Sequence, residues 1–162
     1  RDNQSVKNVD YWISYGYLDT KRLYLNFPYK ASPSFASPHN VSVVCKYIIT
    51  AVKTQVGATY SFASGRPYNN LNDVDFNAAR TPAYRDVSIN VAYLPKPNLI
   101  IYCSATNVPG YDNIFGYEYG RIQNADGLYN RRPVRAPAKR FLFVGIFITL
   151  SKEKLINQLP VL

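Results

Sequence analysis

An all-β fold, an antiparallel up-and-down meander of about six strands, is predicted by three features of the sequence. Apolar and polar residues alternate over stretches of about ten residues, whereas helical periodicity is nearly absent. The connections between these stretches alternate between long and short. The 162-residue chain is 47% hydrophobic and 15% aromatic, so it can offset the entropy cost of folding despite a net charge of +9. These features exclude a disordered basic tail.

Three stretches alternate most clearly, at residues 41–49, 55–62 and 86–93. Each carries apolar side chains on one face and Ser, Thr, Asn, Gln, Asp, Lys or small residues on the other. The residues that share the apolar faces are Val41, Val43, Cys45, Tyr47, Ile49, Val56, Ala58, Tyr60, Phe62, Val87, Ile89, Val91 and Tyr93.

Three more stretches complete the predicted meander. Residues 9–18 follow the same template, with four large apolar residues on one face. Residues 99–106 and 141–150 are apolar on both faces, so the pattern leaves their facing open. The apolar residues of the first stretch are Tyr11, Ile13, Tyr15 and Tyr17.

The long connections are residues 19–39, 65–84 and 107–138, and the short ones are residues 50–53 and 94–98. In a meander, this alternation places every short turn at one end of the sheet and every long loop at the other. Outer-membrane barrels are built in this way, with brief periplasmic turns and extended external loops. The sequence therefore predicts transmembrane strands with three external loops.

The aromatic residues support a lipid-facing surface. With the short turns in the periplasm, Tyr11, Tyr47 and Tyr93 lie near one membrane interface and Tyr17, Tyr60 and Phe62 near the other, as expected for two aromatic girdles. Ten tilted residues cover roughly 26 Å, close to the height of the apolar band. The predicted lipid-facing residues are Val41, Val43, Tyr47, Val56, Tyr60, Phe62, Val87, Ile89, Val91 and Tyr93.

Six strands are too few for a complete barrel, because an open sheet leaves unpaired edges in lipid. The chain also contains no methionine and starts at Arg1. We therefore expect either a piece of a longer polypeptide or an assembly of several copies. Residues 1–151 would form the barrel strands and external loops, and residues 152–162 a short C-terminal tail.

Alternation alone also fits soluble proteins. A β-sandwich would bury the apolar face inside, and a small lipocalin-like barrel would use it to bind an apolar or anionic ligand. A nucleic-acid-binding domain would instead collect its rings on a basic, polar face. The rings here lie on the aliphatic face, so we expect no nucleic-acid partner.

Catalytic and metal-binding signals are weak. His39 is the only histidine, and no Ser, Cys or carboxylate lies at a spacing from it that would indicate a catalytic pair. Cys45 and Cys103 lack metal-ligand spacing and fall on strands that are not neighbours, which predicts free, buried thiols. We expect no enzyme activity, no metal and no cofactor.

The long loops and their flanks carry most of the positive charge. Such a field attracts anionic ligands or lipopolysaccharide phosphates, although ordinary solvated loops carry charge as well. Loop tyrosines and asparagines suit stacking and hydrogen bonding. The candidate ligand-contact residues are Arg66, Tyr68, Asn69, Arg131, Arg132 and Arg135.

Several phrases, taken in order, resemble the C-terminal barrel strands of TonB-dependent outer-membrane receptors. They are DYWISYGYLDTKRLYLNFP, SPSFASPHNVSVVCKYII, GATYSFASGRPYNN, RTPAYRDVSINVAYLPKPN, IIYCSATNVPGYDNIFGYEYG and APAKRFLFVGIFITLS. The resemblance covers residues 9–151. Its most specific parts are the segment from Tyr60 to Tyr68, which ends in Ser64-Gly65-Arg66-Pro67-Tyr68, the Asn107-Val108 pair and the closing strand.

The resemblance implies a barrel of about 22 strands, filled by an N-terminal plug, in the bacterial outer membrane. It implies energised nutrient uptake, with the TonB complex acting through an N-terminal part that this sequence does not contain. Outer-membrane lipid, lipopolysaccharide and the imported ligand are the other implied partners. The ligand's identity, and whether a lipoprotein lid covers the pore, are left open. One departure is that KEKLINQLPVL follows the last strand, where a terminal aromatic residue is common in the family.

Overall fold

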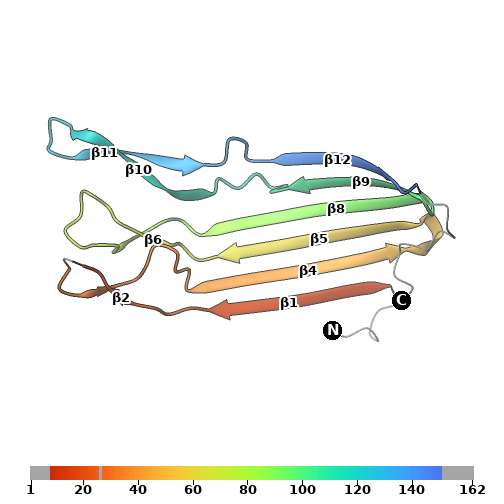
Figure 1. The fold of residues 1–162 in the computed structure, drawn as a ribbon, viewed down its shortest axis with the longest axis horizontal. Coiled ribbons are helices and arrows are strands. Elements are labelled where there is room, and N and C mark those ends of the chain that lie inside the picture. Colours follow the sequence, from red (N-terminus) through yellow and green to blue (C-terminus); the bar gives the residue numbers. More distant parts are fainter. Residues whose placement is uncertain (1–7, 26, 151–162) are drawn as a thin grey trace.

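The computed structural model describes residues 8–25 and 27–150, and its backbone is predominantly β. Its main feature is one antiparallel sheet with the strand order β1-β4-β5-β8-β9-β12 (Figure 1). Each main strand therefore pairs with the next one along the chain, which confirms the predicted meander. The strands are β1 (Val9–Tyr17), β4 (His39–Ile49), β5 (Thr54–Ala63), β8 (Tyr84–Lys96), β9 (Leu99–Thr106) and β12 (Phe141–Ile148).

Both short connections lie at the same end of the sheet (Figure 1). The first contains the 3₁₀ turn η1 (Thr50–Val52), which ends at Lys53 in the left-handed conformation. The second is shorter than predicted, because β8 continues to Lys96 and only Pro97 and Asn98 separate it from β9. The β8–β9 pairing is irregular between Tyr93 and Lys96, which accommodates Pro95 without a ladder hydrogen bond.

Each long connection contains a further antiparallel pair at the opposite end of the sheet (Figure 1). The predicted loop boundaries at residues 39 and 84 are slightly wrong, because His39 opens β4 and Tyr84 opens β8. The third connection is mostly a hairpin, with Asp126 and Gly127 in its turn. The pairs are β2 (Arg22–Leu23) with β3 (Lys30–Ala31), β6 (Pro67–Tyr68) with β7 (Ala79–Arg80), and β10 (Ile114–Gln123) with β11 (Tyr129–Arg135).

Pairing register determines which side chains share a face, because directly opposed residues point the same way. Val43 lies opposite Ile13 and Tyr60, and Tyr60 lies opposite Val87. Continued along each strand by alternation, this register puts all ten predicted lipid-facing residues on one face. We call this surface the apolar face and the opposite surface the polar face.

The register also assigns the two strands whose facing the sequence left open. Ile89 lies opposite Ala105, and Ala105 lies opposite Leu142, so these residues continue the apolar face. The remaining apolar-face residues of the two strands are Leu99, Ile101, Cys103, Val144, Ile146 and Ile148.

The polar face consists largely of hydroxyl, amide and small side chains over β1, β4, β5 and β8. It becomes aromatic toward β12, where Phe143 lies opposite Ser104 and its ring is 6.1 Å from that of Tyr102. The polar-face residues include Ser14, Gly16, Asn40, Ser42, Gly57, Thr59, Ser61, Asp86, Ser88, Asn90, Ser104 and Thr106.

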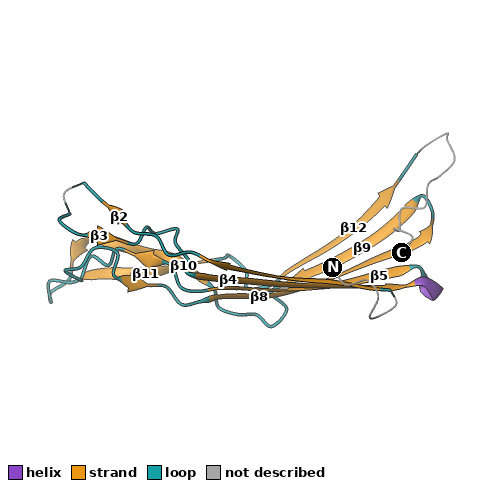
Figure 2. Cartoon of the chain, turned by 90° about the horizontal axis from the view of Figure 1, so that it is seen from below, coloured by secondary structure: helices purple, strands orange, loops and turns teal. Residues whose placement is uncertain are grey.

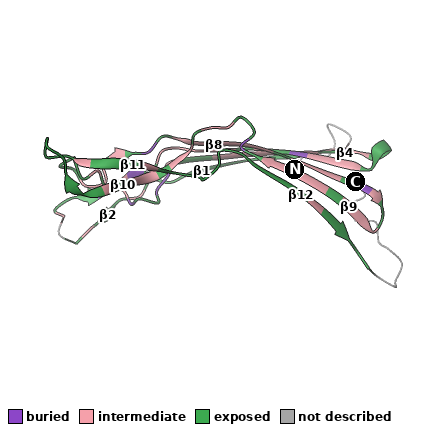
Figure 3. Ribbon diagram, turned by 90° about the horizontal axis from the view of Figure 1, so that it is seen from above, coloured by how far each residue is buried: buried purple, intermediate pink, exposed green. Residues whose placement is uncertain are grey.

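The sheet is a single layer, as the edge-on view in Figure 2 shows, and it bends where β9 and β12 rise away from the other strands. Most residues are exposed or half-buried (Figure 3). Ile13 is 67% exposed and Val144 63% exposed, although both lie on the apolar face. Within residues 8–25 and 27–150, the buried hydrophobic residues are Ala31, Ala36, Ile48 and Leu94.

The 152–162 tail predicted from the sequence lies outside the described residues. Cys45 and Cys103 are free thiols, as predicted. Their predicted burial is wrong, because Cys45 is exposed and Cys103 half-buried. Both lie on the apolar face of this uncovered sheet, which explains the difference.

Candidate functional site

Three neighbouring cavities lie on or beside the polar face at the end of the sheet that carries the long connections. Their volumes are about 390, 220 and 530 Å³, and Tyr84, the first residue of β8, lines all three. Arg66 lines the second and third, and Phe115 lines the first and second. We call this set the Tyr84 cavities and treat it as the candidate site.

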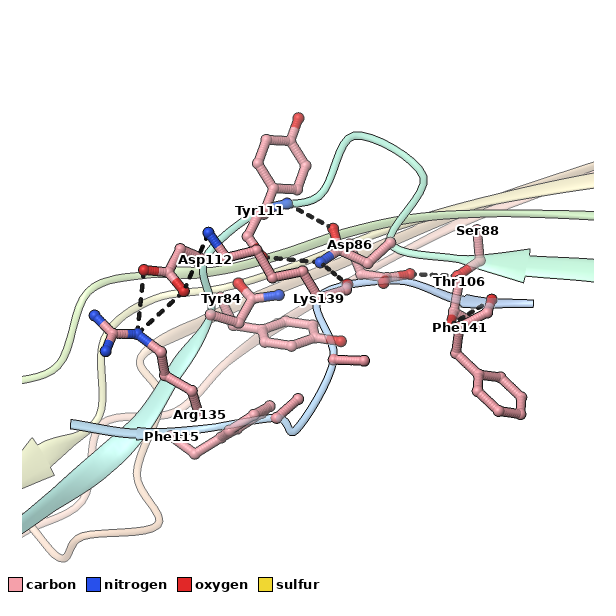
Figure 4. A pocket seen from close by; sticks show the side chains of 14 residues that line it. Tyr84, Asp86, Ser88, Thr106, Tyr111, Asp112, Phe115, Arg135, Lys139 and Phe141 are labelled. Carbon is pink, nitrogen blue, oxygen red and sulfur yellow. Dashed lines mark hydrogen bonds and ion pairs between the residues drawn. The ribbon is translucent and has the colours of Figure 1, made fainter.

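The first of these cavities lies between β8, β9 and the two ends of the third long connection (Figure 4). Its wall contains an ion cluster in which Nε of Arg135 is 3.1 Å from both carboxylate oxygens of Asp112. Nζ of Lys139 is 3.8 Å from the same carboxylate. The charge of Asp112 is thus shared between two cations.

A second carboxylate lies deeper in the first cavity. Asp86 is half-buried and accepts a hydrogen bond from the hydroxyl of Ser88 at 2.5 Å. Within the described residues, no cation forms an ion pair with Asp86. The rings of Tyr84 and Phe115, with centroids 6.2 Å apart, flank this polar wall. The cavity therefore offers both aromatic surface and hydrogen-bond acceptors.

Asn107 holds the two ends of the third connection together. Its side-chain amide nitrogen donates to the backbone oxygens of Tyr111 at 2.9 Å and Lys139 at 2.6 Å, and its side-chain oxygen accepts from the Tyr111 backbone amide at 2.9 Å. Asn107 is buried and has a positive φ of 49°, a region that asparagine tolerates better than most residues. These bonds fix the wall that carries Lys139.

The base of the second connection is built around Gly65. The backbone amide of Arg66 donates to the Thr81 hydroxyl at 3.0 Å, and the Thr81 amide donates to the Arg66 oxygen at 2.9 Å. Nη1 of Arg80 donates to the Gly65 oxygen at 3.2 Å. A Cβ on Gly65 would lie 1.8 Å from the Thr81 oxygen, so only glycine fits here. This close approach positions Arg66 at the cavity wall.

The second and third connections meet at an aromatic cluster. The rings of Tyr68 and Tyr117 lie 4.7 Å apart, and the Arg131 guanidinium lies 5.0 Å from the Tyr117 ring centroid. Nη1 of Arg131 also donates to the Tyr68 hydroxyl at 2.9 Å. Asn72 adds two hydrogen bonds to the backbone of Tyr129, at 2.8 and 3.0 Å. The two connections therefore form one unit.

Tyr119 extends this cluster by donating its hydroxyl to the side-chain oxygen of Asn70 at 2.7 Å. Burial raises the pKa of Tyr119 above its usual value, and neighbouring Tyr68 adds to that rise, while Arg131 opposes it. The phenol therefore stays protonated, and able to donate this hydrogen bond, across the physiological pH range.

The first connection is linked to the second in the same way. The Phe76 ring stacks on Phe27 at 4.1 Å and meets Tyr24 edge-on at 5.0 Å. The Phe76 backbone amide donates to the Tyr29 hydroxyl at 3.2 Å. All three long connections thus form one linked structure beyond the end of the sheet that carries them (Figure 1).

The predicted ligand-contact residues divide into two groups. Arg66 and Arg135 line the Tyr84 cavities, and Tyr68 and Arg131 form the aromatic cluster above them. Arg132 instead pairs with Glu118 at 2.7 Å, with both side chains mostly exposed, and lines none of the three cavities. Asn69 is exposed and lines none of the three cavities.

The sequence prediction missed Tyr84, Asp86, Asp112 and Phe115. Tyr84 was placed at the end of a loop, whereas it begins the longest strand and lies on the polar face. Asp112 and Phe115 depend on the β10–β11 hairpin, which the Asp126-Gly127 pair signals as a classical tight-turn sequence. Recognising that hairpin would have brought residues 112–115 and 135–139 together.

This arrangement is suited to binding. In the described part of the chain, no group of three or more His, Cys, Asp or Glu side chains is placed to hold a metal ion. No helix among residues 8–25 and 27–150 is long and apolar enough to cross a membrane.

No protein-family model matches the chain, and no curated protein matches it either. The likeness to TonB-dependent receptors therefore stays a prediction.

Proposed function

We propose that this chain is a wall segment of a TonB-dependent receptor in the bacterial outer membrane, and that its linked external connections help to capture an imported nutrient. The chain binds and positions its ligand and carries out no catalysis. Energy coupling through the TonB complex belongs to other parts of the receptor.

The observation that carries this proposal is the continuous apolar face. It extends over all six main strands and includes Ile13, Val43, Ile89 and Val144. No element of the described chain covers it. Soluble monomers rarely expose apolar patches larger than a few hundred Å². A hydrocarbon core would solvate this face, and the strand lengths suit the height of an apolar membrane band.

The Tyr84 cavities support the ligand-capture part. They open on or beside the polar face, which becomes the interior once the sheet is closed into a barrel with its apolar face outward. They lie at the end that carries the long connections, where a ligand arriving from outside would first meet the barrel. Their mixture of rings, carboxylates and paired cations suits an organic solute with several polar groups.

Fractionation of source cells with an antibody against residues 107–138 tests the proposal. We expect a band in the outer membrane that migrates faster when the sample is left unheated, as folded barrels do. Its mass should be several times 18.4 kDa. A soluble band near 18.4 kDa would refute the membrane assignment and favour the lipocalin-like ligand-binding barrel.

The ligand-capture part needs a separate measurement. Arg66→Ala and Tyr84→Ala would be compared with Arg132→Ala in growth assays on single nutrients, with surface expression held equal. The first two line the cavities, whereas Arg132 pairs with Glu118 outside them. Uptake should fall only for the first two, and equal uptake by all three would show that the cavities do not contact the ligand.

A further inference from the structure

The first of the Tyr84 cavities contains a carboxylate that no cation neutralises. Asp86 is half-buried on the polar face of β8, where the hydroxyl of Ser88 donates to one of its oxygens at 2.5 Å. Among residues 8–25 and 27–150, no cation forms an ion pair with it. The adjacent Arg85 pairs with Phe62, so its side chain leaves the sheet on the apolar side. Asp86 therefore presents an uncompensated negative charge to the cavity.

Two aromatic rings line the same cavity as this carboxylate (Figure 4). Tyr84 precedes Asp86 by two residues on β8, so alternation puts both side chains on the polar face. The ring of Phe115 lies 6.2 Å from that of Tyr84. A solute cation is attracted both by a carboxylate and by the faces of aromatic rings, whereas a solute anion is repelled by the carboxylate. This part of the cavity therefore favours a positively charged group.

Asn113 fixes the wall that carries Phe115 onto β8. Its side-chain oxygen accepts from the backbone amide of Arg85 at 3.0 Å, and its side-chain nitrogen donates to the backbone oxygen of Arg85 at 2.7 Å. Arg85 lies between Tyr84 and Asp86 in the chain, so these two hydrogen bonds hold the start of β10 beside both residues. A site whose walls are already fixed loses less conformational entropy when a ligand binds.

Another wall of the cavity carries the opposite charge. Arg135 and Lys139 share the single carboxylate of Asp112, at 3.1 and 3.8 Å, so the cluster keeps a surplus of positive charge. A solute cation is repelled by this cluster and attracted by Asp86. The distribution of charge inside the cavity thus gives a cationic group one preferred position.

We infer that this cavity binds a solute that carries a protonated amine, with the ammonium group held by Asp86 beside the rings of Tyr84 and Phe115. The inference rests on the proposed function, since it names the chemical class of the captured nutrient. It differs from the expectation of an anionic ligand that the basic loops suggest. The carboxylate inside the cavity decides the preference, because exposed charges more than about 8 Å away are largely screened at physiological salt.

The test uses the full-length polypeptide, extracted from outer membranes in mild detergent and titrated with two matched probes by ligand-observed NMR. Nα-acetyl-lysinamide carries an ammonium group, and Nα-acetyl-norleucinamide has the same carbon chain without it. The first probe should bind at least about tenfold more tightly, because a hydrogen bond between charged groups is worth about that factor.

Three variants locate the source of this preference. Asp86→Asn keeps an oxygen for the Ser88 hydrogen bond but removes the charge, so affinity for the amine probe should fall about tenfold, to that of the neutral probe. Lys139→Gln removes a repelling cation from the cavity, so it should raise the affinity for the amine probe. The matched control is Asp126→Asn, an exposed residue in the β10–β11 turn that lines none of the three cavities, and it should change neither affinity.

Equal binding of the two probes by the unaltered protein, or an unchanged preference in Asp86→Asn, would overturn the inference while leaving the membrane assignment intact. If Asp86→Asn fails to reach the outer membrane, the absence of a gain in Lys139→Gln would overturn it instead. A polypeptide that fractionation does not find in the outer membrane would overturn both proposals together.

Discussion

Gly65 shows how a single residue shapes the candidate site. We predict that Gly65→Ala destabilises the folded protein by roughly 1–3 kcal/mol, because the new methyl group must displace the Thr81 backbone oxygen, 1.8 Å from the Cβ position. The Arg66–Thr81 hydrogen bonds would break with that displacement. Urea unfolding of the protein in detergent measures the loss.

Gly16→Ala is the matched control for this change. A Cβ on Gly16, on the polar face of β1, meets no atom within 4 Å. The free energy of unfolding of the Gly16→Ala variant should therefore stay within about 0.5 kcal/mol of that of the unaltered protein. Equal stability of the two variants would mean that the second connection can shift away from Gly65 at little cost.

The sequence singled out Arg66, Tyr68 and Arg135 because arginine and tyrosine in long connections are natural contact residues. The structure places the two arginines at cavity walls and Tyr68 in the aromatic cluster, and their contact with a ligand stays a prediction. The sequence did not show which of the arginines already form an ion pair with a carboxylate. Nothing in the sequence distinguishes Arg132, paired with exposed Glu118, from Arg66 at a cavity wall. Pairing depends on the β10–β11 register, which brings residues 118 and 132 together.

At the scale of the strand, neighbouring residues of β8 should respond oppositely to the same charge. Ile89→Arg, on the apolar face, should cost roughly 2–4 kcal/mol if that face contacts the bilayer core. Ser88→Arg lies on the polar face beside Asp86, so it should cost far less. Unfolding of the two variants in lipid vesicles, followed by tryptophan fluorescence, compares them directly, and equal costs would reject the assigned facing.

Strand prediction was most accurate where one face is strictly polar. In β4, β5 and β8, alternation alone identifies the apolar face that the register confirms. It was silent for β9 and β12, since Tyr102, Phe143 and Phe147 make the other face apolar too. For such strands, only the cross-strand pairing shows which side chains belong to the apolar face. The short pairs β2–β3 and β6–β7 were missed because two residues carry no periodicity.

At the scale of the whole molecule, the two cysteines report on what covers the apolar face. Cys45 and Cys103 both lie there, and Cys45 is exposed on the uncovered sheet. In intact outer membranes, a charged maleimide should fail to modify either one, because a bilayer excludes charged reagents. After denaturation both should react, as measured by mass spectrometry of their peptides.

Asn69→Cys supplies the positive control for that measurement. Asn69 lies exposed in the second connection, so its thiol should react in intact membranes. Modification of Cys45 at the same rate as this introduced thiol would mean that water, and not lipid, contacts the apolar face.

The whole-molecule architecture was predictable because each main strand pairs only with its neighbours in the chain.

The pairing of each main strand with its neighbours in the chain also has a consequence for how the sheet is assembled. A growing sheet of this kind can add one hairpin at a time, and each partly built stage offers one ready template edge to the next strand. Adding a strand therefore requires no rearrangement of the strands that are already paired, so the sheet can be assembled one strand at a time. A strand paired out of register by one residue would place its apolar side chains on the polar face, so the error would be exposed at once.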